Sequence, residues 1–114
     1  NMDEDLNKGP EEQEALQLIC QNLGVDETSI DGREALIGMI AQRVNDLLEN
    51  DKDLLLSYLY RLDISMKRIN EMLKLKHIIP PHESIARLIF ERQVDRVRTK
   101  KKYKIPPIEE GWEF

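Results

Sequence analysis

Residues 35–48 read ALIGMIAQRVNDLL, and this stretch decides the fold because its apolar side chains recur every three to four residues. That spacing places the apolar side chains on one side of an α-helix, so it predicts a helix from about residue 32 to residue 49. The stripe consists of Leu36, Ile37, Ile40, Ala41, Val44, Leu47 and Leu48. A stripe this wide indicates burial against more than one neighbour, and we expect the helix at the centre of the domain. Gly38, flanked by Ala35 and Ala41, is interpreted as the place of a close helix crossing.

Four more helices are predicted on either side of this central one. The bounds expected for them are residues 10–24, 54–62, 66–73 and 82–101. Gly24 provides a stop for the first, because glycine readily adopts the left-handed conformation that ends many helices. Residues 50–53 and the pair Asp63 and Ser65 supply N-caps for the third and fourth. The fold class expected is therefore all-α, a small bundle of about five helices with an extended C-terminal tail. The side chains expected to be most buried are Leu36, Ile40, Val44, Leu55, Leu59, Leu62 and Ile69.

The length of 114 residues and a hydrophobic content of 40% fit one domain with its own core. We expect a flexible acidic arm over residues 1–9, a single helical domain over 10–104 and an extended, proline-containing tail over 105–114. No apolar run approaches the ~20 residues that a membrane span requires. The single cysteine, Cys20, excludes an internal disulfide, and a cytoplasmic location is the simplest expectation.

The net charge of −5 hides a strong polarity along the chain. The first 34 residues carry a charge of −8, residues 35–84 are neutral, residues 85–104 carry +6 and the tail carries −3. Such asymmetry is typical of proteins that bind nucleic acid or an acidic partner. It is equally expected if the acidic N-terminal part neutralises the basic helix, within one chain or across a dimer.

The sequence gives little support for catalysis. His77 and His82 straddle two prolines and lack the i, i+4 spacing of a helical metal site. Cys20 lies on an apolar stripe, where a cysteine behaves as a small hydrophobic side chain. We therefore expect no catalytic residue, no metal site and no cofactor, and predict that the protein is not an enzyme.

Residues 59–73, LYRLDISMKRINEML, combine the end of a helix, a short turn, a serine N-cap and a second helix. This segment resembles the helix-turn-helix family, in which the second helix enters the major groove of DNA. By position, the resemblance implies base contacts from Ser65, Lys67, Arg68 and Glu71. The segment departs from the family pattern at Leu59, where a small residue is usual, and at Asp63, where the turn usually carries glycine.

The last predicted helix changes its apolar side in the middle. Ile85, Leu88 and Ile89 lie on one side, whereas Phe90, Val94 and Val97 lie roughly 145° away at 100° per residue. We interpret the change as one half docked in the domain and the other half in contact with something else. That neighbour is predicted to be a second copy, another protein, or the chain's own tail folded back on Phe90 and Val94.

The tail carries Trp112 and Phe114 in a chain with only 5% aromatic residues. Tryptophan is enriched at binding hot spots, so the function favoured by the sequence is a non-enzymatic protein that binds a protein partner or itself, as a homodimer. The contact residues predicted for it are Phe90, Val94, Val97, Trp112 and Phe114. The alternative is nucleic-acid binding through the segment 59–73 and the basic helix 87–102. The residues predicted for that alternative are Ser65, Lys67, Arg68, Arg92, Arg96, Arg98, Lys100, Lys101 and Lys102.

Overall fold

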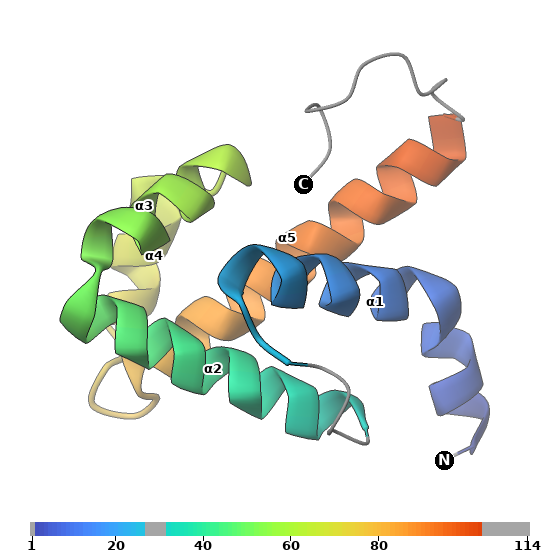
Figure 1. The fold of residues 1–114 in the computed structure, drawn as a ribbon, viewed down its shortest axis with the longest axis horizontal. Coiled ribbons are helices and arrows are strands. Elements are labelled where there is room, and N and C mark those ends of the chain that lie inside the picture. The colour runs from blue at the N-terminus through green and yellow to red at the C-terminus, as the bar shows by residue number, and fades with distance from the viewer. Residues whose placement is uncertain (1, 27–31, 104–114) are drawn as a thin grey trace.

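The computed structural model describes residues 2–26 and 32–103, with side chains for residues 9–26 and 32–102. It contains five helices (Figure 1), which are α1 (Met2–Leu23), α2 (Arg33–Asn50), α3 (Lys52–Arg61), α4 (Met66–Leu73) and α5 (Pro81–Tyr103). No strand occurs within these two ranges. The expected all-α class and the five helices are therefore confirmed. The predicted tail 105–114, including Trp112 and Phe114, lies outside the described residues.

Three of the signals expected to begin or end helices are found in the structure. Gly24 follows the last residue of α1 with a φ of 75°, a left-handed conformation that glycine adopts without strain. The Asp51 side chain caps α3 by accepting a hydrogen bond of 3.2 Å from the Leu54 N–H. Ser65 caps α4 in the same way, because its hydroxyl accepts from the Arg68 N–H at 3.2 Å. Each cap satisfies one of the helical N–H groups that have no partner within the helix.

A kink divides α1. Gly9 has non-helical backbone angles, with a φ of 31° and a ψ of −144°, and it separates a helical turn region over residues 2–8 from the longer part that carries the apolar stripe. The first helix therefore begins at Met2 and not at residue 10, so residues 2–8 of the predicted arm 1–9 are helical. The flexibility of this arm stays a prediction.

The helices pack around a central pair formed by α2 and α5 (Figure 1). The first helix, α1, lies against both members of the pair and covers α5 most extensively. Helix α3 packs on α2, and α4 packs on α5. The expected central position of the helix 32–49 is thus shared with α5. Among the described residues, no helix has the length and apolar character needed to cross a membrane.

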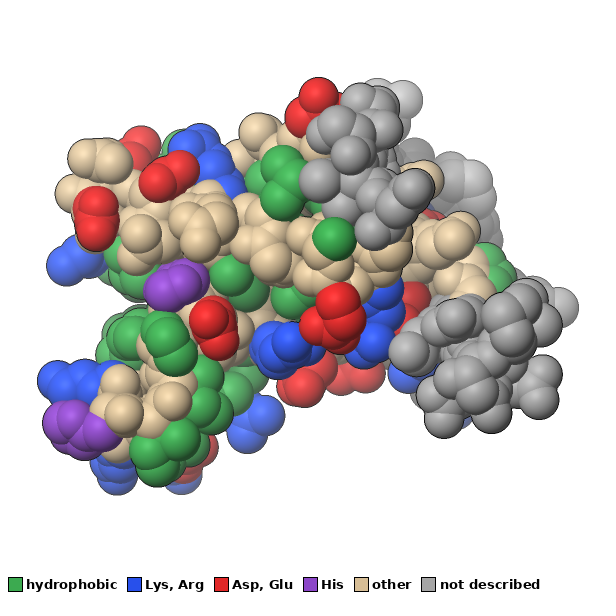
Figure 2. Space-filling model, turned by 90° about the horizontal axis from the view of Figure 1, so that it is seen from below, with side chains coloured by type: hydrophobic (Ala, Val, Ile, Leu, Met, Phe, Trp, Pro, Cys, Tyr) green, Lys and Arg blue, Asp and Glu red, His purple; other side chains and the backbone are tan. Residues whose placement is uncertain are grey.

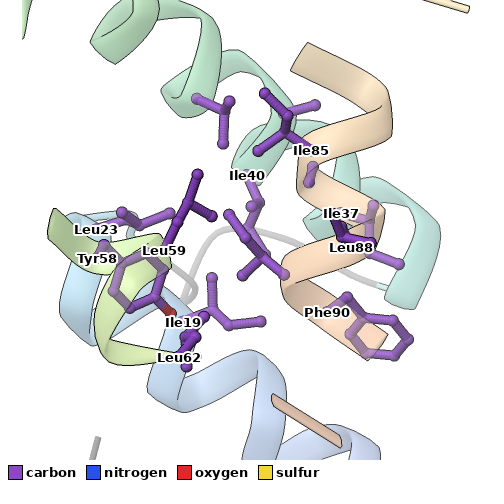
Figure 3. Close-up of a cluster of buried hydrophobic side chains, with 14 of the residues drawn as sticks. Ile19, Leu23, Ile37, Ile40, Tyr58, Leu59, Leu62, Ile85, Leu88 and Phe90 are labelled. Carbon is purple, nitrogen blue, oxygen red and sulfur yellow. The ribbon is translucent and has the colours of Figure 1, made fainter. Parts of the chain in front are cut away.

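The core lies where α1, α2, α3 and α5 converge, and Figure 3 shows labelled side chains from each of them pointing inward. Six of the seven predicted core side chains are buried, and the exception is Leu36, which is only partly buried at the edge of the core. Gly38 is exposed, and a Cβ placed on it would have no atom within 4 Å. The interpretation of Gly38 as a close helix crossing is therefore wrong.

Candidate interaction surface

The second apolar stripe of α5 belongs to the core. Phe90, Val94 and Val97 are 6%, 5% and 3% exposed, and they share one cluster with the buried side chains of α1. A cation–π contact also covers Phe90, whose ring centroid lies 5.2 Å from the Arg33 guanidinium carbon. The neighbour required by the change of side is therefore α1 of the same chain. The prediction that these three residues form a partner-binding surface is corrected accordingly.

Two of the predicted nucleic-acid residues, Arg92 and Arg96, are partly buried in the domain. Arg92 donates a hydrogen bond of 2.7 Å from Nε to the Leu62 carbonyl, and its Nη2 lies 3.8 Å from a carboxylate oxygen of Asp63. It thereby fastens α5 to the turn between α3 and α4. Burial lowers the pKa of Arg96 from its ordinary value, and the nearby charge of Arg92 lowers it further. Both arginines are only partly exposed, so they are less accessible to a ligand than the sequence suggests.

The remaining basic residues of α5 are spread around the helix. Arg98 and Lys100, Lys101 and Lys102 are exposed. At 100° per residue, Arg98 and Lys102 lie on the side of the helix opposite to the line of Arg92, Arg96 and Lys100. Lys101 is turned towards α1, where its Nζ lies 3.7 Å from Glu14. The structure therefore does not gather the predicted basic residues of α5 on one face.

The turn of the helix-turn-helix-like segment has the backbone conformation that is usual in the family. The two helices on either side of the turn, however, are not packed as the family requires. Asp63 has a φ of 64°, the left-handed conformation usually supplied by glycine. Leu59, however, is 2% exposed within the core, and α3 and α4 pack on α2 and α5 rather than mainly on each other. Ser65, Lys67 and Arg68 are all exposed at the start of α4. The local turn supports the resemblance, and the divergence of the two helices argues against it.

Replacement of Asp63 by glycine is expected to stabilise the domain by up to about 1 kcal/mol, because a non-glycine residue in the left-handed region carries strain of about 1–2 kcal/mol. The substitution also removes the ion pair with Arg92, but an exposed pair contributes only about 0–1 kcal/mol. Urea unfolding of Asp63→Gly measures the net effect. Asp63→Asn is the control, because asparagine tolerates the same φ and lacks the charge. A lower free energy of unfolding for the glycine variant than for Asp63→Asn would contradict the strain argument.

A different surface gathers exposed apolar and basic side chains, and we call it the connector surface. It consists of the exposed face of α4 and the connection to α5, with Lys67, Arg68, Lys74, Leu75, Lys76, Ile78 and Ile79. Ile78 is 78% exposed, and Leu75 and Ile79 are 44% and 39% exposed. Figure 2 shows hydrophobic and basic side chains together at this end of the molecule, beside a histidine.

Backbone hydrogen bonds define the shape of the connection. The Ile78 and Ile79 N–H groups both donate to the Leu75 carbonyl at 2.9 Å, and Leu75 in turn donates to Met72 at 3.0 Å. These successive turns continue from the end of α4 and hold Ile78 away from the core. The apolar side chains are therefore presented by a hydrogen-bonded backbone, which lowers the entropy lost when a partner binds.

The cations of the connector surface have no partners in the described part of the chain. The side chains of Lys67, Arg68, Lys74 and Lys76 form no hydrogen bond or ion pair there, in contrast to Arg87, Arg92 and Lys101. Glu71 is the one acidic residue between positions 66 and 80. This end of the molecule is thus locally positive although the whole chain carries −5.

Cys20, Tyr58 and His82 carry functional groups that can take part in chemistry, and none of them belongs to the connector surface. Cys20 is 1% exposed, and Tyr58 is fully buried, which raises the pKa of its phenol above the ordinary value. His82 lines an open hollow of about 270 Å³ between α2 and α5, next to an ion pair of 2.9 Å between Arg87 and Glu34. Within the described residues, no three histidine, cysteine, aspartate or glutamate side chains are grouped as metal ligands.

Comparison with known proteins adds no relative. No protein-family model matches the chain, and neither a curated protein nor a solved structure shows significant similarity to it.

Proposed function

We propose that this chain is a non-enzymatic binding protein whose connector surface takes an acidic segment of a protein that also carries apolar side chains. The observation that carries the proposal is the juxtaposition of three exposed apolar side chains with four cations that have no partner among the described residues, all within residues 67–79. Both features point to the same occupant. The protein class predicted from the sequence is retained, and the contact surface moves from the second half of α5 to α4 and the connection.

The apolar part supplies affinity. Single exposed apolar side chains are common on protein surfaces, but Leu75, Ile78 and Ile79 fall within five residues on one ordered connection. Full burial of one isoleucine or leucine side chain contributes about 1.5–3 kcal/mol. An occupant that covers all three therefore gains several kcal/mol before the entropy costs of association.

The charged part supplies selectivity. Lys74 and Lys76 flank Leu75, and Lys67 and Arg68 lie at the other end of α4. Complementary charge speeds encounter with an acidic partner and disfavours a basic one. A partner with glutamates or aspartates around an apolar anchor fits this arrangement, whereas two connector surfaces facing each other would repel.

Nucleic-acid binding is the second candidate, favoured by the left-handed turn at Asp63 and by the exposed Lys67 and Arg68 at the start of α4. Two observations weigh against it. The phosphate backbone offers nothing apolar to cover Ile78, and the basic residues of α5 do not lie on one face of that helix.

A photo-crosslinking experiment in the native cells separates these candidates. A photoreactive phenylalanine at position 78 is expected to give a crosslinked product whose added mass is protein and which nuclease leaves intact. The matched control places the same group at Tyr60, which is 83% exposed on α3 and does not belong to the connector surface. Equal crosslinking at both positions, or none at 78, contradicts the proposed surface. A nuclease-sensitive product would favour the second candidate.

A further inference from the structure

We infer that the occupant of the connector surface is the C-terminal segment, residues 105–114, of a second copy of this chain, so that two copies exchange tails. This inference rests on the proposed function and names its partner. The segment reads IPPIEEGWEF and carries a charge of −3 together with Trp112, Phe114 and two isoleucines. It has the two properties required of the occupant, which are negative charge and large apolar anchors.

The other acidic segments of the chain do not meet both requirements. Residues 2–8 contain no aromatic side chain. Farther along α1, two acidic side chains are already engaged. Glu12 lies 3.1 Å from Arg33, and Glu14 lies 3.7 Å from Lys101. Residues 105–114 combine three glutamates with two aromatic side chains, a combination found in no other stretch of ten residues.

The docking site that the sequence suggests for the tail is already covered by the core of the same chain. Phe90 and Val94, onto which it might fold back, are buried in the cluster shared with α1. The tail is therefore not needed to shield Phe90 and Val94 from water. The connector surface, in contrast, presents Ile78 almost fully exposed.

The length of α5 favours docking between copies. Its 23 residues extend over about 33 Å at a rise of 1.5 Å per residue. Nine residues from Tyr103 to Trp112 span at most about 32 Å when fully extended. Figure 1 shows the connection at the end of α5 opposite to Tyr103, so Trp112 of the same chain could reach Ile78 only with the tail almost fully extended along the whole of α5. The tail of a second copy has no such limit.

Reciprocal exchange gives a closed dimer. Each copy donates one tail and accepts one, as a two-fold axis requires. Once the first tail is bound, the second binds within the same complex, which raises its effective concentration. Two modest contacts thus hold the dimer without a large flat interface.

Trp112 allows a direct test because it is the only tryptophan of the chain. With rising protein concentration, its emission is expected to shift to the blue while light scattering shows the mass doubling over the same range. A blue-shifted emission that is the same at every concentration, at a constant monomer mass, would mean docking within one chain. A constant emission typical of a solvent-exposed tryptophan, at a constant monomer mass, would mean no docking. Either result overturns the inference.

A mixing experiment identifies the acceptor and the donor. Ile78→Asp disables the acceptor and keeps Trp112, whereas Trp112→Ala disables the donor and keeps the connector surface. Each variant alone is expected to be weakened in dimerisation at least tenfold. Because Ile78 is 78% exposed, the aspartate does not threaten folding. Mixed together, the two variants are expected to form a heterodimer in which the emission of the Ile78→Asp copy shifts to the blue.

Tyr60→Asp is the matched control, since it places the same charge at an equally exposed aromatic position on α3 and is expected to leave the dimer intact. Failure of the mixture to associate, or an undisturbed dimer of Ile78→Asp, overturns the inference. The proposed function fails separately. If crosslinking from position 78 yields a protein product whose mass differs from that of two copies, the occupant is another protein and only the tail exchange is wrong.

Discussion

Val94→Glu is expected to unfold the domain. Val94 is 5% exposed in the cluster where α1 packs on α5, and a carboxylate there has no partner. Burial of an unpaired charge costs several kcal/mol, and a domain of this size has about 5–15 kcal/mol of stability in total. Circular dichroism should therefore show loss of helix, or a midpoint of urea unfolding lowered so far that the variant is only partly folded in water.

The control for Val94→Glu is Arg98→Glu, which places the same side chain one turn further along α5 at an exposed position. It is expected to change the free energy of unfolding by less than about 1 kcal/mol, as is usual for surface substitutions. A Val94→Glu variant as stable as Arg98→Glu would mean that the second stripe is accessible. In that case the original prediction of a partner surface at Phe90, Val94 and Val97 would be restored.

Leu59→Asp is expected to have a comparable effect through a different helix. Leu59 is 2% exposed where α3 meets the core, between the buried side chains of Tyr58 and Leu62 (Figure 3). The substitution removes the apolar contacts and buries a charge, so a loss of at least about 4 kcal/mol is expected. Differential scanning calorimetry should show no cooperative transition, or one at a much lower temperature.

Leu56→Asp makes the same chemical change on the same helix. Leu56 is 39% exposed, so the new carboxylate can reach water and the expected loss is about 1 kcal/mol. If the two variants are equally destabilised, the effect belongs to the helix propensity of aspartate rather than to the burial of Leu59.

The helices could be predicted from the sequence because their signals are local. The apolar period of residues 35–48 identifies α2, and Gly24 and Ser65 adopt the conformations and contacts that end α1 and begin α4. The burial of side chains at the edge of an apolar stripe is harder to predict. The helical period shows to which side of the helix a side chain points, but not how far it is buried. Leu36 is consequently only partly buried, and Gly38 faces the hollow beside α5 instead of a second helix.

The interaction surface could not be predicted in the same way, because it depends on which helices pack together, and the spacing of apolar residues does not show this. The change of apolar side in α5 accompanies a change of neighbour, but the neighbours predicted for it, a second copy, another protein or the tail, do not include α1. Nothing in the spacing of Phe90 and Val94 shows that α1 covers them. Arg92 likewise looks like one of several surface cations until its hydrogen bond with the Leu62 carbonyl is seen. A signal for the connector surface is present in the sequence, since Ile78 and Ile79 stand between Lys76 and the prolines without a helical period to bury them.

The packing of α1 on α5 has a consequence for folding during synthesis. The two helices are the first and the last of the domain, so the contacts between them join residues that are about 80 positions apart. While the ribosome makes α2, α3 and α4, much of the apolar face of α1 has no partner. Completion of the core must wait until residues 90–97 have left the exit tunnel, because Phe90, Val94 and Val97 provide the missing side. Contacts between distant residues also slow folding through the entropy of loop closure. The nascent chain is therefore expected to become resistant to protease in one late step, after α5 emerges.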